Sequence, residues 1–143
     1  MAVEMEQMFS ELFEAAGVGR RLGEEIAAVA GQTQARWQLL WTIAEAKLTV
    51  PQIARRLGVS RQHILRLAHE LAAEELVEFS PNPDHKTSPL LTITPTGEST
   101  LAAINHAAER SHEAILRDLT PERLAELRTL LRRFTELVKA ARA

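Results

Sequence analysis

One stretch of the chain concentrates positive charge. Residues 46–69 contain one lysine and four arginines and no acidic residue, although the whole chain has a formal net charge of −2. Both flanks are acidic: residues 1–30 hold six glutamates against two arginines, and residues 70–97 hold five acids against one lysine. A compact group of cations is typical of a surface that binds phosphate, although a basic helix face is more often only solvated.

The same stretch has the pattern of two short helices joined by a tight turn. Ala54 is small enough to stand where two steeply crossing helices touch, and Gly58 can adopt the positive φ that the turn requires. Thr49 and Gln52 have capping-box spacing for the first helix, and Ser60 can cap the second. The pattern predicts a helix-turn-helix over residues 50–74, with a plain helical hairpin as the alternative. Five positions that must then face the core are all apolar, namely Ile53, Leu57, Val59, Ile64 and Leu67.

A helix-turn-helix binds double-stranded DNA by placing its second helix in the major groove. With Ile64 and Leu71 directed toward the core, the helical period puts Gln62 and Arg66 on the opposite face. Arginine can pair bidentately with guanine and glutamine with adenine, whereas the arginines of the first helix suit phosphate. The predicted DNA-binding residues of the two helices are Arg55, Arg56, Ser60, Arg61, Gln62, His63, Arg66 and His69.

The hydrophobic period changes after residue 74. Residues 76–79 and 90–94 are short apolar or β-branched runs, and the loop between them holds three prolines. This pattern predicts a strand–loop–strand wing over residues 76–94. Lys86 lies in its loop, and we expect it to contact DNA phosphate. A wing after a helix-turn-helix makes the fold a winged helix, in a chain that is mainly α overall.

The rest of the chain is predicted to be helical. Gly17 and Gly19 kink or break the first helix, and the sequence leaves open which of the two they do. The terminal segments 1–32 and 98–143 carry broad apolar faces, more than a small central unit can cover. We therefore expect these helices to form a homodimer, with a monomer that folds them back as the alternative. A helix of about residues 33–46 is expected to direct Trp37, Leu40, Trp41 and Ala44 toward the core.

The complete pattern resembles the MarR family of dimeric transcriptional regulators. The resemblance covers essentially the entire chain, as one domain of residues 1–143 with a DNA-binding lobe at 33–97. It depends on the N-terminal helical block, on Ala35-Arg36-Trp37-Gln38-Leu39-Leu40, on the wing residues Asn82-Pro83-Asp84-His85-Lys86 and on Leu91-Thr92-Ile93-Thr94-Pro95-Thr96-Gly97. It implies a homodimer on a pseudo-palindromic operator, often released by a small phenolic or other ligand.

The chain departs from the family pattern at two positions. Lys86 stands where the family usually has arginine, and lysine lacks the planar fork that enters a minor groove. Glu75 stands where the family favours glycine, before the first wing strand. Both departures predict that the wing contributes less to DNA affinity than it does in the family.

The resemblance also implies an effector site between the dimerisation helices and the winged-helix lobe. Flat apolar rings would suit a small aromatic effector there, and core packing is the alternative role for them. The candidate lining residues are Phe9, Phe13, Trp37 and Trp41.

Other classes of function have little support in the sequence. The chain has no cysteine and no catalytic motif, so we expect neither an enzyme nor a cofactor. His106 and His112 are six residues apart, off the spacing that pairs metal ligands on one helix face, so no metal site is expected. No apolar run could span a membrane, which predicts a cytoplasmic protein. The remaining rival is a winged-helix dimer that contacts proteins and has little affinity for DNA.

Overall fold

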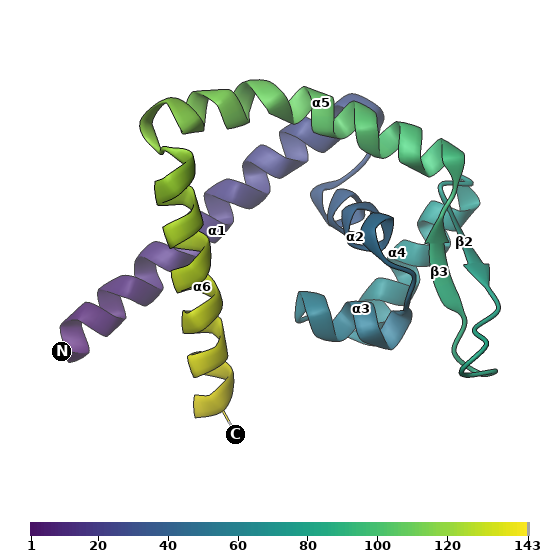
Figure 1. Ribbon diagram of the computed structural model, residues 1–143, viewed down its shortest axis with the longest axis horizontal. Coiled ribbons are helices and arrows are strands. Elements are labelled where there is room, and N and C mark those ends of the chain that lie inside the picture. Colours follow the sequence, from purple (N-terminus) through teal and green to yellow (C-terminus); the bar gives the residue numbers. More distant parts are fainter. Residues whose placement is uncertain (143) are drawn as a thin grey trace. The chain divides into compact units, whose positions relative to one another are not determined.

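The computed structural model describes residues 1–142, which form helices and one small sheet (Figure 1). The chain divides into two compact units, one of residues 1–107 and one that begins at Ala108. The described elements are α1 (Ala2–Ala27), the short 3-10 helix η1 (Ala28–Ala30), α2 (Gln34–Glu45), β1 (Leu48–Thr49), α3 (Val50–Leu57), α4 (Arg61–Ala73), β2 (Val77–Ser80), β3 (Leu90–Ile93), α5 (Pro95–Asp118) and α6 (Pro121–Ala141).

A hydroxyl side chain caps the start of each helix from α2 to α6. The Oγ1 of Thr33 accepts a hydrogen bond from the backbone N–H of Arg36 (3.2 Å), and Ser60 Oγ accepts one from His63 (3.0 Å). Thr49 and Gln52 form the complete predicted capping box at the start of α3. Such caps satisfy backbone N–H groups that have no partner within the helix. Thr120 caps α6 in the same way.

The first helix settles the question that its glycines left open. α1 runs from Ala2 to Ala27 without interruption, so neither Gly17 nor Gly19 breaks it. The chain turns after η1, where Gly31 takes a left-handed conformation.

The sheet ties the wing to the start of the helix-turn-helix. Its three strands are antiparallel in the order β1-β3-β2, so the predicted hairpin of β2 and β3 gains a third strand. In that strand Leu48 pairs with Leu91 and Thr49 with Leu90. The sequence analysis did not predict β1, which is only two residues long.

The core of residues 1–107 lies between α2, α3, α4 and the sheet. Its fully buried side chains include Leu39 and Leu40 from α2, Ile53 from α3 and Leu91 from β3, and α4 contributes Ile64 and Leu71. The prediction for α2 was partly wrong: Leu39 and Ile43 are buried, whereas Trp41 is 55% exposed. Val59, predicted to face the core, is exposed in the turn between α3 and α4.

The turn that joins α4 to the wing is held in an unusual backbone conformation. Glu75 has a φ of +62°. Among the described residues it is the only one other than glycine with a positive φ. The N–H of Glu75 bonds to the carbonyl of Ala72, and the N–H of Leu76 bonds to that of Leu71. These two bonds form a Schellman motif, which favours glycine at the position of Glu75. The family preference for glycine here therefore has a conformational reason.

The first turn of α5 packs directly on that junction. Thr94 donates a hydrogen bond from Oγ1 to the carbonyl of Glu75 (2.7 Å) and accepts one from the N–H of Gly97 (3.0 Å). A Cβ added to Gly97 would lie 2.0 Å from the carbonyl oxygen of Leu76, which is inside van der Waals contact. Only glycine fits this position with the backbone as it stands.

The unit that begins at Ala108 contains the end of α5 and all of α6. None of the described residues of α6 is buried, and Leu130 and Leu137 are 67% and 50% exposed. At the other end of the chain, Met5, Phe13 and Val18 of α1 are exposed as well. No helix among the described residues is long and apolar enough to cross a membrane.

Candidate nucleic-acid interface

The outer face of α4 gathers most of the predicted DNA-binding residues. Ile64, Leu67, Ala68 and Leu71 are buried on one side of this helix. On the other side Arg61, Gln62, Arg66 and His69 are exposed, as the helical period predicts. Four of the predicted residues line an open hollow of about 460 Å³ at the N-terminal end of the helix, namely Ser60, Gln62, His63 and Arg66.

The guanidinium of Arg66 is held along the surface of α4. Its Nη1 forms an ion pair with Glu70 Oε1 (3.5 Å), one helical turn later. Its Nη2 lies 3.1 Å from His63 Nδ1, which accepts a hydrogen bond when the neutral ring carries its proton on Nε2. A guanidinium has five N–H donors, so these two contacts leave three for a base edge. The Arg66 guanidinium is thus oriented at the surface, and three of its N–H donors remain available.

Glu70 also contacts a second arginine, which the sequence analysis did not identify. Arg36, in the first turn of α2, lies 3.2 Å from Glu70 Oε2 through Nη2 and 2.8 Å from Glu74 Oε2 through Nη1. Gln32, which is buried, donates a hydrogen bond to Glu74 Oε1 (3.1 Å) and accepts one from Arg36 (3.4 Å). These contacts join the start of α2 to the C-terminal end of α4. The only sequence signal was two glutamates four residues apart at the end of the basic stretch.

His69 has a partner of a different kind. Its ring lies against Phe79 of the wing strand β2, with ring centroids 5.4 Å apart. The side chain is exposed, but this contact places it at the junction of α4 with the wing. Its predicted contact with DNA stays a prediction.

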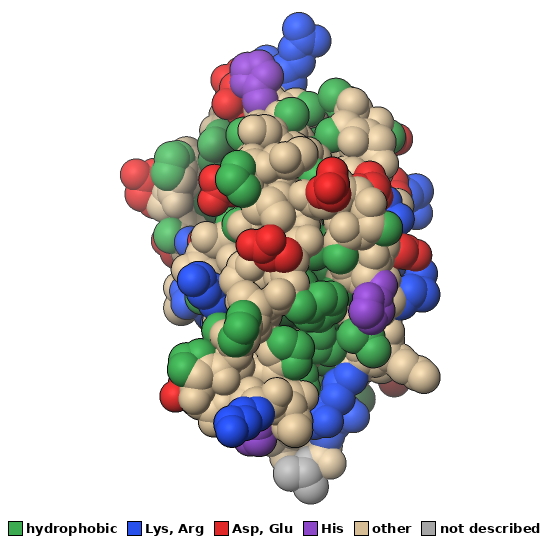
Figure 2. Space-filling view, turned by 90° about the vertical axis from the view of Figure 1, so that its right-hand side faces the viewer, with side chains coloured by type: hydrophobic (Ala, Val, Ile, Leu, Met, Phe, Trp, Pro, Cys, Tyr) green, Lys and Arg blue, Asp and Glu red, His purple; other side chains and the backbone are tan. Residues whose placement is uncertain are grey.

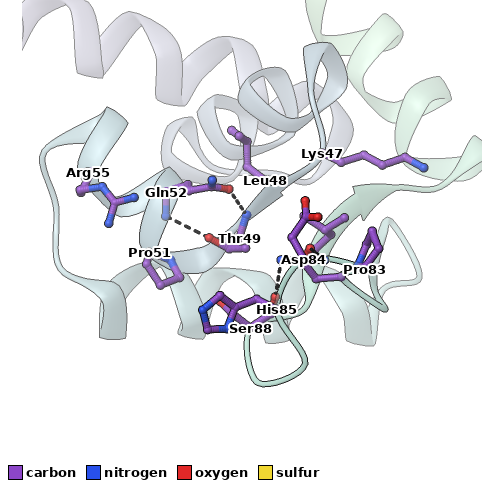
Figure 3. A pocket seen from close by; sticks show the side chains of 12 residues that line it. Lys47, Leu48, Thr49, Pro51, Gln52, Arg55, Pro83, Asp84, His85 and Ser88 are labelled. Carbon is purple, nitrogen blue, oxygen red and sulfur yellow. Dashed lines mark hydrogen bonds between the residues drawn. The ribbon is translucent and has the colours of Figure 1, made fainter.

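A second open cavity, of about 580 Å³, separates the helix-turn-helix from the wing loop (Figure 3). Lys47, just before β1, and Arg55 of α3 line one side of it, and Asp84 and His85 of the wing loop line the other. Arg55 and Arg56 are both exposed on α3, and their predicted contact with phosphate stays a prediction. The capping box of Thr49 and Gln52 lies in this wall, so the backbone here is fixed.

The wing loop is closed by one asparagine. Asn82 accepts a hydrogen bond from the N–H of Asp84 (3.1 Å) and donates one from Nδ2 to the carbonyl of Ser88 (3.0 Å). Lys86 is exposed between these two ends. These two hydrogen bonds of Asn82 hold the loop in shape, and the Lys86 side chain stays accessible to solvent or a ligand.

On one face of the molecule (Figure 2), charge is less segregated than it is along the sequence. On the face drawn in Figure 2, acidic and basic side chains both occur, with hydrophobic side chains open to solvent between them. Two acidic residues lie close to the DNA-binding candidates: Glu70 on α4, and Glu74 as the C-cap of that helix. Their ion pairs with Arg36 offset this negative charge next to the predicted contact surface.

The four aromatic residues predicted to line an effector site have different surroundings. Phe9 and Phe13 stack on each other along α1 with ring centroids 6.1 Å apart, and Phe13 is 67% exposed. Trp37 packs partly against the core and donates a hydrogen bond from Nε1 to Asn105 Oδ1 (3.0 Å), whereas Trp41 is exposed. An effector pocket built from these four side chains stays a prediction.

Residues 1–142 contain histidine, aspartate and glutamate side chains, the usual candidates for metal ligands in a chain without cysteine. No cluster of three or more histidine, aspartate or glutamate side chains there could hold a metal ion. His106 and His112 thus belong to no such cluster.

Known proteins are similar to this chain in sequence and in fold. The profile of the MarR family matches residues 30–86. The Uncharacterized protein Rv2011c of Mycobacterium tuberculosis is 44% identical over 142 residues, which cover 99% of each chain.

Two solved structures show the extent of the likeness in fold. A mutant MarR from E. coli, complexed with operator DNA, superposes with a TM-score of 0.78 at 22% identity and covers 92% of this chain and 95% of its own. A Staphylococcus aureus MarR, in complex with salicylate and kanamycin, gives a TM-score of 0.80 at 16% identity over 96% of this chain and 94% of its own. With the helix-turn-helix, the wing and the flanking helices all in place, the chain belongs to the MarR family of winged-helix transcriptional regulators.

Proposed function

We propose that this protein is a homodimeric transcriptional regulator, without enzymatic activity, that binds a pseudo-palindromic DNA operator. The observation that carries the proposal is the outer face of α4, where Ser60, Gln62, His63 and Arg66 surround one open hollow. Polar side chains on a helix of this kind are what base edges in a major groove require. The E. coli relative of the same fold was solved with operator DNA, which supports the proposal.

The arginines have two different roles in this proposal. Arg66 reads a base, because its guanidinium lies on the exposed face of α4 with donors to spare. Arg55 and Arg56 contact phosphate, because both are exposed on α3, and Arg55 also lines the cavity that faces the wing. Phosphate contacts fix the register of a protein on DNA, and base contacts give it specificity.

The exposed apolar side chains of the terminal helices support dimerisation. A two-fold dimer would cover the leucines of α6 and would place two copies of α4 on one DNA duplex. Operators of such dimers have half-sites about one helical turn apart.

The first experiment measures DNA binding at two salt concentrations. The purified protein is titrated against the DNA upstream of its own gene and against a random duplex of the same length. A DNA-binding dimer should prefer the upstream DNA and should lose affinity steeply with salt, as neutralised phosphates release their counterions. Weak binding that is equal for both duplexes and insensitive to salt would favour the rival role in protein–protein contact.

Two alanine variants separate base reading from phosphate binding. Arg66→Ala should cost about 1–3 kcal/mol on the preferred duplex and little on the random one. Arg55→Ala should weaken binding to both duplexes alike and reduce the salt slope by about 1. Equal losses on both duplexes for Arg66→Ala would contradict its assignment as a base reader.

We also propose that a small aromatic acid acts as the effector. The S. aureus relative was solved with salicylate, and Trp37 is partly buried where α2 meets the rest of residues 1–107. Salicylate should then quench tryptophan fluorescence and lower the affinity for the preferred duplex. Unchanged emission across a panel of aromatic acids would count against an effector of this class.

A further inference from the structure

We infer that Glu70 is a positioning residue for DNA recognition, which presents the guanidinium of Arg66 to a base while Arg36 fixes the carboxylate. The inference depends on the proposed function and adds a residue that determines specificity without touching DNA. The two oxygens of Glu70 are divided between the two arginines: Oε2 lies 3.2 Å from Arg36 Nη2, and Oε1 lies 3.5 Å from Arg66 Nη1.

Glu70 alone would not hold the Arg66 side chain in one orientation. The Arg66 side chain is 61% exposed, and an ion pair one helical turn apart at an exposed site is weak because water and salt screen it. A mobile carboxylate would leave the guanidinium free to sample many rotamers. Something must therefore hold Glu70 in place.

Arg36 supplies that restraint from another helix. Its side chain is only 21% exposed, and its Nε and Nη2 both approach Glu70 Oε2, at 3.4 and 3.2 Å. The other side of the same guanidinium is held by Glu74 at 2.8 Å. Gln32, buried at the turn before α2, bonds to both Arg36 and Glu74. The carboxylate of Glu70 is thus anchored to a partly buried network, and its free oxygen faces Arg66.

The network also explains how an acidic residue can lie close to DNA. A glutamate on the recognition helix would normally repel phosphate. Here the charge of Glu70 lies between two guanidinium groups, so its negative field is largely offset. His63 Nδ1, on the other side of Arg66, completes the alignment at 3.1 Å. An arginine that is already ordered gives up less rotamer freedom when it pairs with a base.

Glu74 provides a matched control in the same network. Glu70→Gln and Glu74→Gln each remove one negative charge from α4 and one carboxylate partner of Arg36. Only Glu70→Gln also releases Arg66. Any effect of net charge or of Arg36 on folding will be similar in both variants, whereas an effect on the orientation of Arg66 will be larger in Glu70→Gln.

The experiment measures discrimination at single base pairs. Short duplexes that the full-length wild-type protein selects from a random library provide the preferred half-site. Each G·C pair of that half-site is then replaced by A·T, one at a time, and affinities are measured at one salt concentration. Arg66→Ala first identifies the position that Arg66 reads, as the one where discrimination disappears.

Glu70→Gln should reduce discrimination at that same position by about threefold to tenfold, the gain expected from ordering one long side chain beforehand. Affinity for random DNA should stay the same or rise, because a negative charge has been removed. Glu74→Gln weakens only the far side of Arg36, so it should reduce discrimination at that position less than Glu70→Gln does. In the double variant Glu70→Gln/Arg66→Ala, the first substitution should have no further effect, because it acts through the second residue.

Glu70→Asp guards against a misleading change in charge or stability. It keeps the carboxylate but withdraws it by one methylene, so it should lose the same discrimination as Glu70→Gln. Equal effects of Glu70→Gln and Glu74→Gln, a loss spread evenly over all positions, or additive effects in the double variant would overturn the inference while leaving the proposed function intact. A wild-type protein with no sequence preference would overturn both.

Discussion

The winged helix at residues 33–97 and the terminal helices differ in how far their apolar side chains are buried within one chain. In the winged helix Leu39, Ile64 and Leu71 are fully buried within a single chain. In α6 none of the described residues is buried, and Leu130 is 67% exposed. The chain can therefore complete its central core alone, whereas its terminal helices have apolar faces that a second molecule would cover. The following predictions test this contrast.

The largest expected effect comes from placing charge on the exposed face of α6. Leu130→Glu combined with Leu137→Glu should convert the protein to a monomer in sedimentation experiments and should leave its far-UV circular dichroism unchanged. Affinity for the preferred duplex should fall about a hundredfold or more, because two linked half-site contacts become one.

Arg133→Ala is the matched control on the same helix, since it removes only an exposed ion pair with Glu136. This variant should stay dimeric. A dimer that survives both glutamate substitutions would show that α6 is not the contact surface.

A large effect on stability is expected within the winged helix. Leu71→Ala deletes a fully buried side chain and should cost about 2–5 kcal/mol in urea unfolding. Leu65→Ala, on the exposed side of the same helix, should cost less than about 0.5 kcal/mol. Both are best measured with the α6 glutamates present, so that dimerisation does not contribute. Similar costs for the two would mean that the core does not close as described.

A smaller loss should follow Gly97→Ala, because its Cβ would meet the carbonyl oxygen of Leu76. Forcing an extra carbon into this contact should cost about 1–3 kcal/mol. Gly19→Ala, in α1, is the contrasting variant, since a Cβ there meets nothing within 4 Å. It should stabilise the protein by about 0.5–1 kcal/mol in thermal unfolding. A Gly97→Ala protein as stable as wild type would contradict the close packing of α5 on the wing junction.

The smallest effect is a gain at the turn before β2. Glu75→Gly should stabilise the protein by about 1 kcal/mol, because glycine adopts a φ of +62° without the steric cost that glutamate incurs. Glu74→Gly, one residue earlier with a φ of −90°, should instead destabilise it. Chemical denaturation of the two variants side by side decides the point. A loss of stability in both would show that the Glu75 side chain compensates for its own strain.

Much of the fold could be predicted because its signals are local. Thr49 with Gln52 indicates a helix start over four residues, Gly58 indicates a left-handed turn, and Ser60 indicates the next helix. The same local period places Gln62 and Arg66 on the exposed face of α4. None of these features depends on residues far away in the chain.

What sequence reasoning missed depends on contacts between distant residues. β1 has only two residues and exists because Leu48 pairs with Leu91, 43 positions later. Arg36 meets Glu70 and Glu74 across 34 and 38 positions, which no periodicity reveals. For α2, the large ring of Trp41 suggested the wrong buried face, since tertiary packing turned Leu39 and Ile43 inward instead.

Thr49 serves two elements at once, as the last residue of β1 and the cap of α3. Because this single residue connects β1, which pairs with the wing strand β3, to α3, the wing and α3 cannot move independently of each other. A displacement of the β2–β3 hairpin, by DNA or by another bound molecule, would therefore tilt α3. The two segments should open together, so their backbone amides should exchange with deuterium at matched rates.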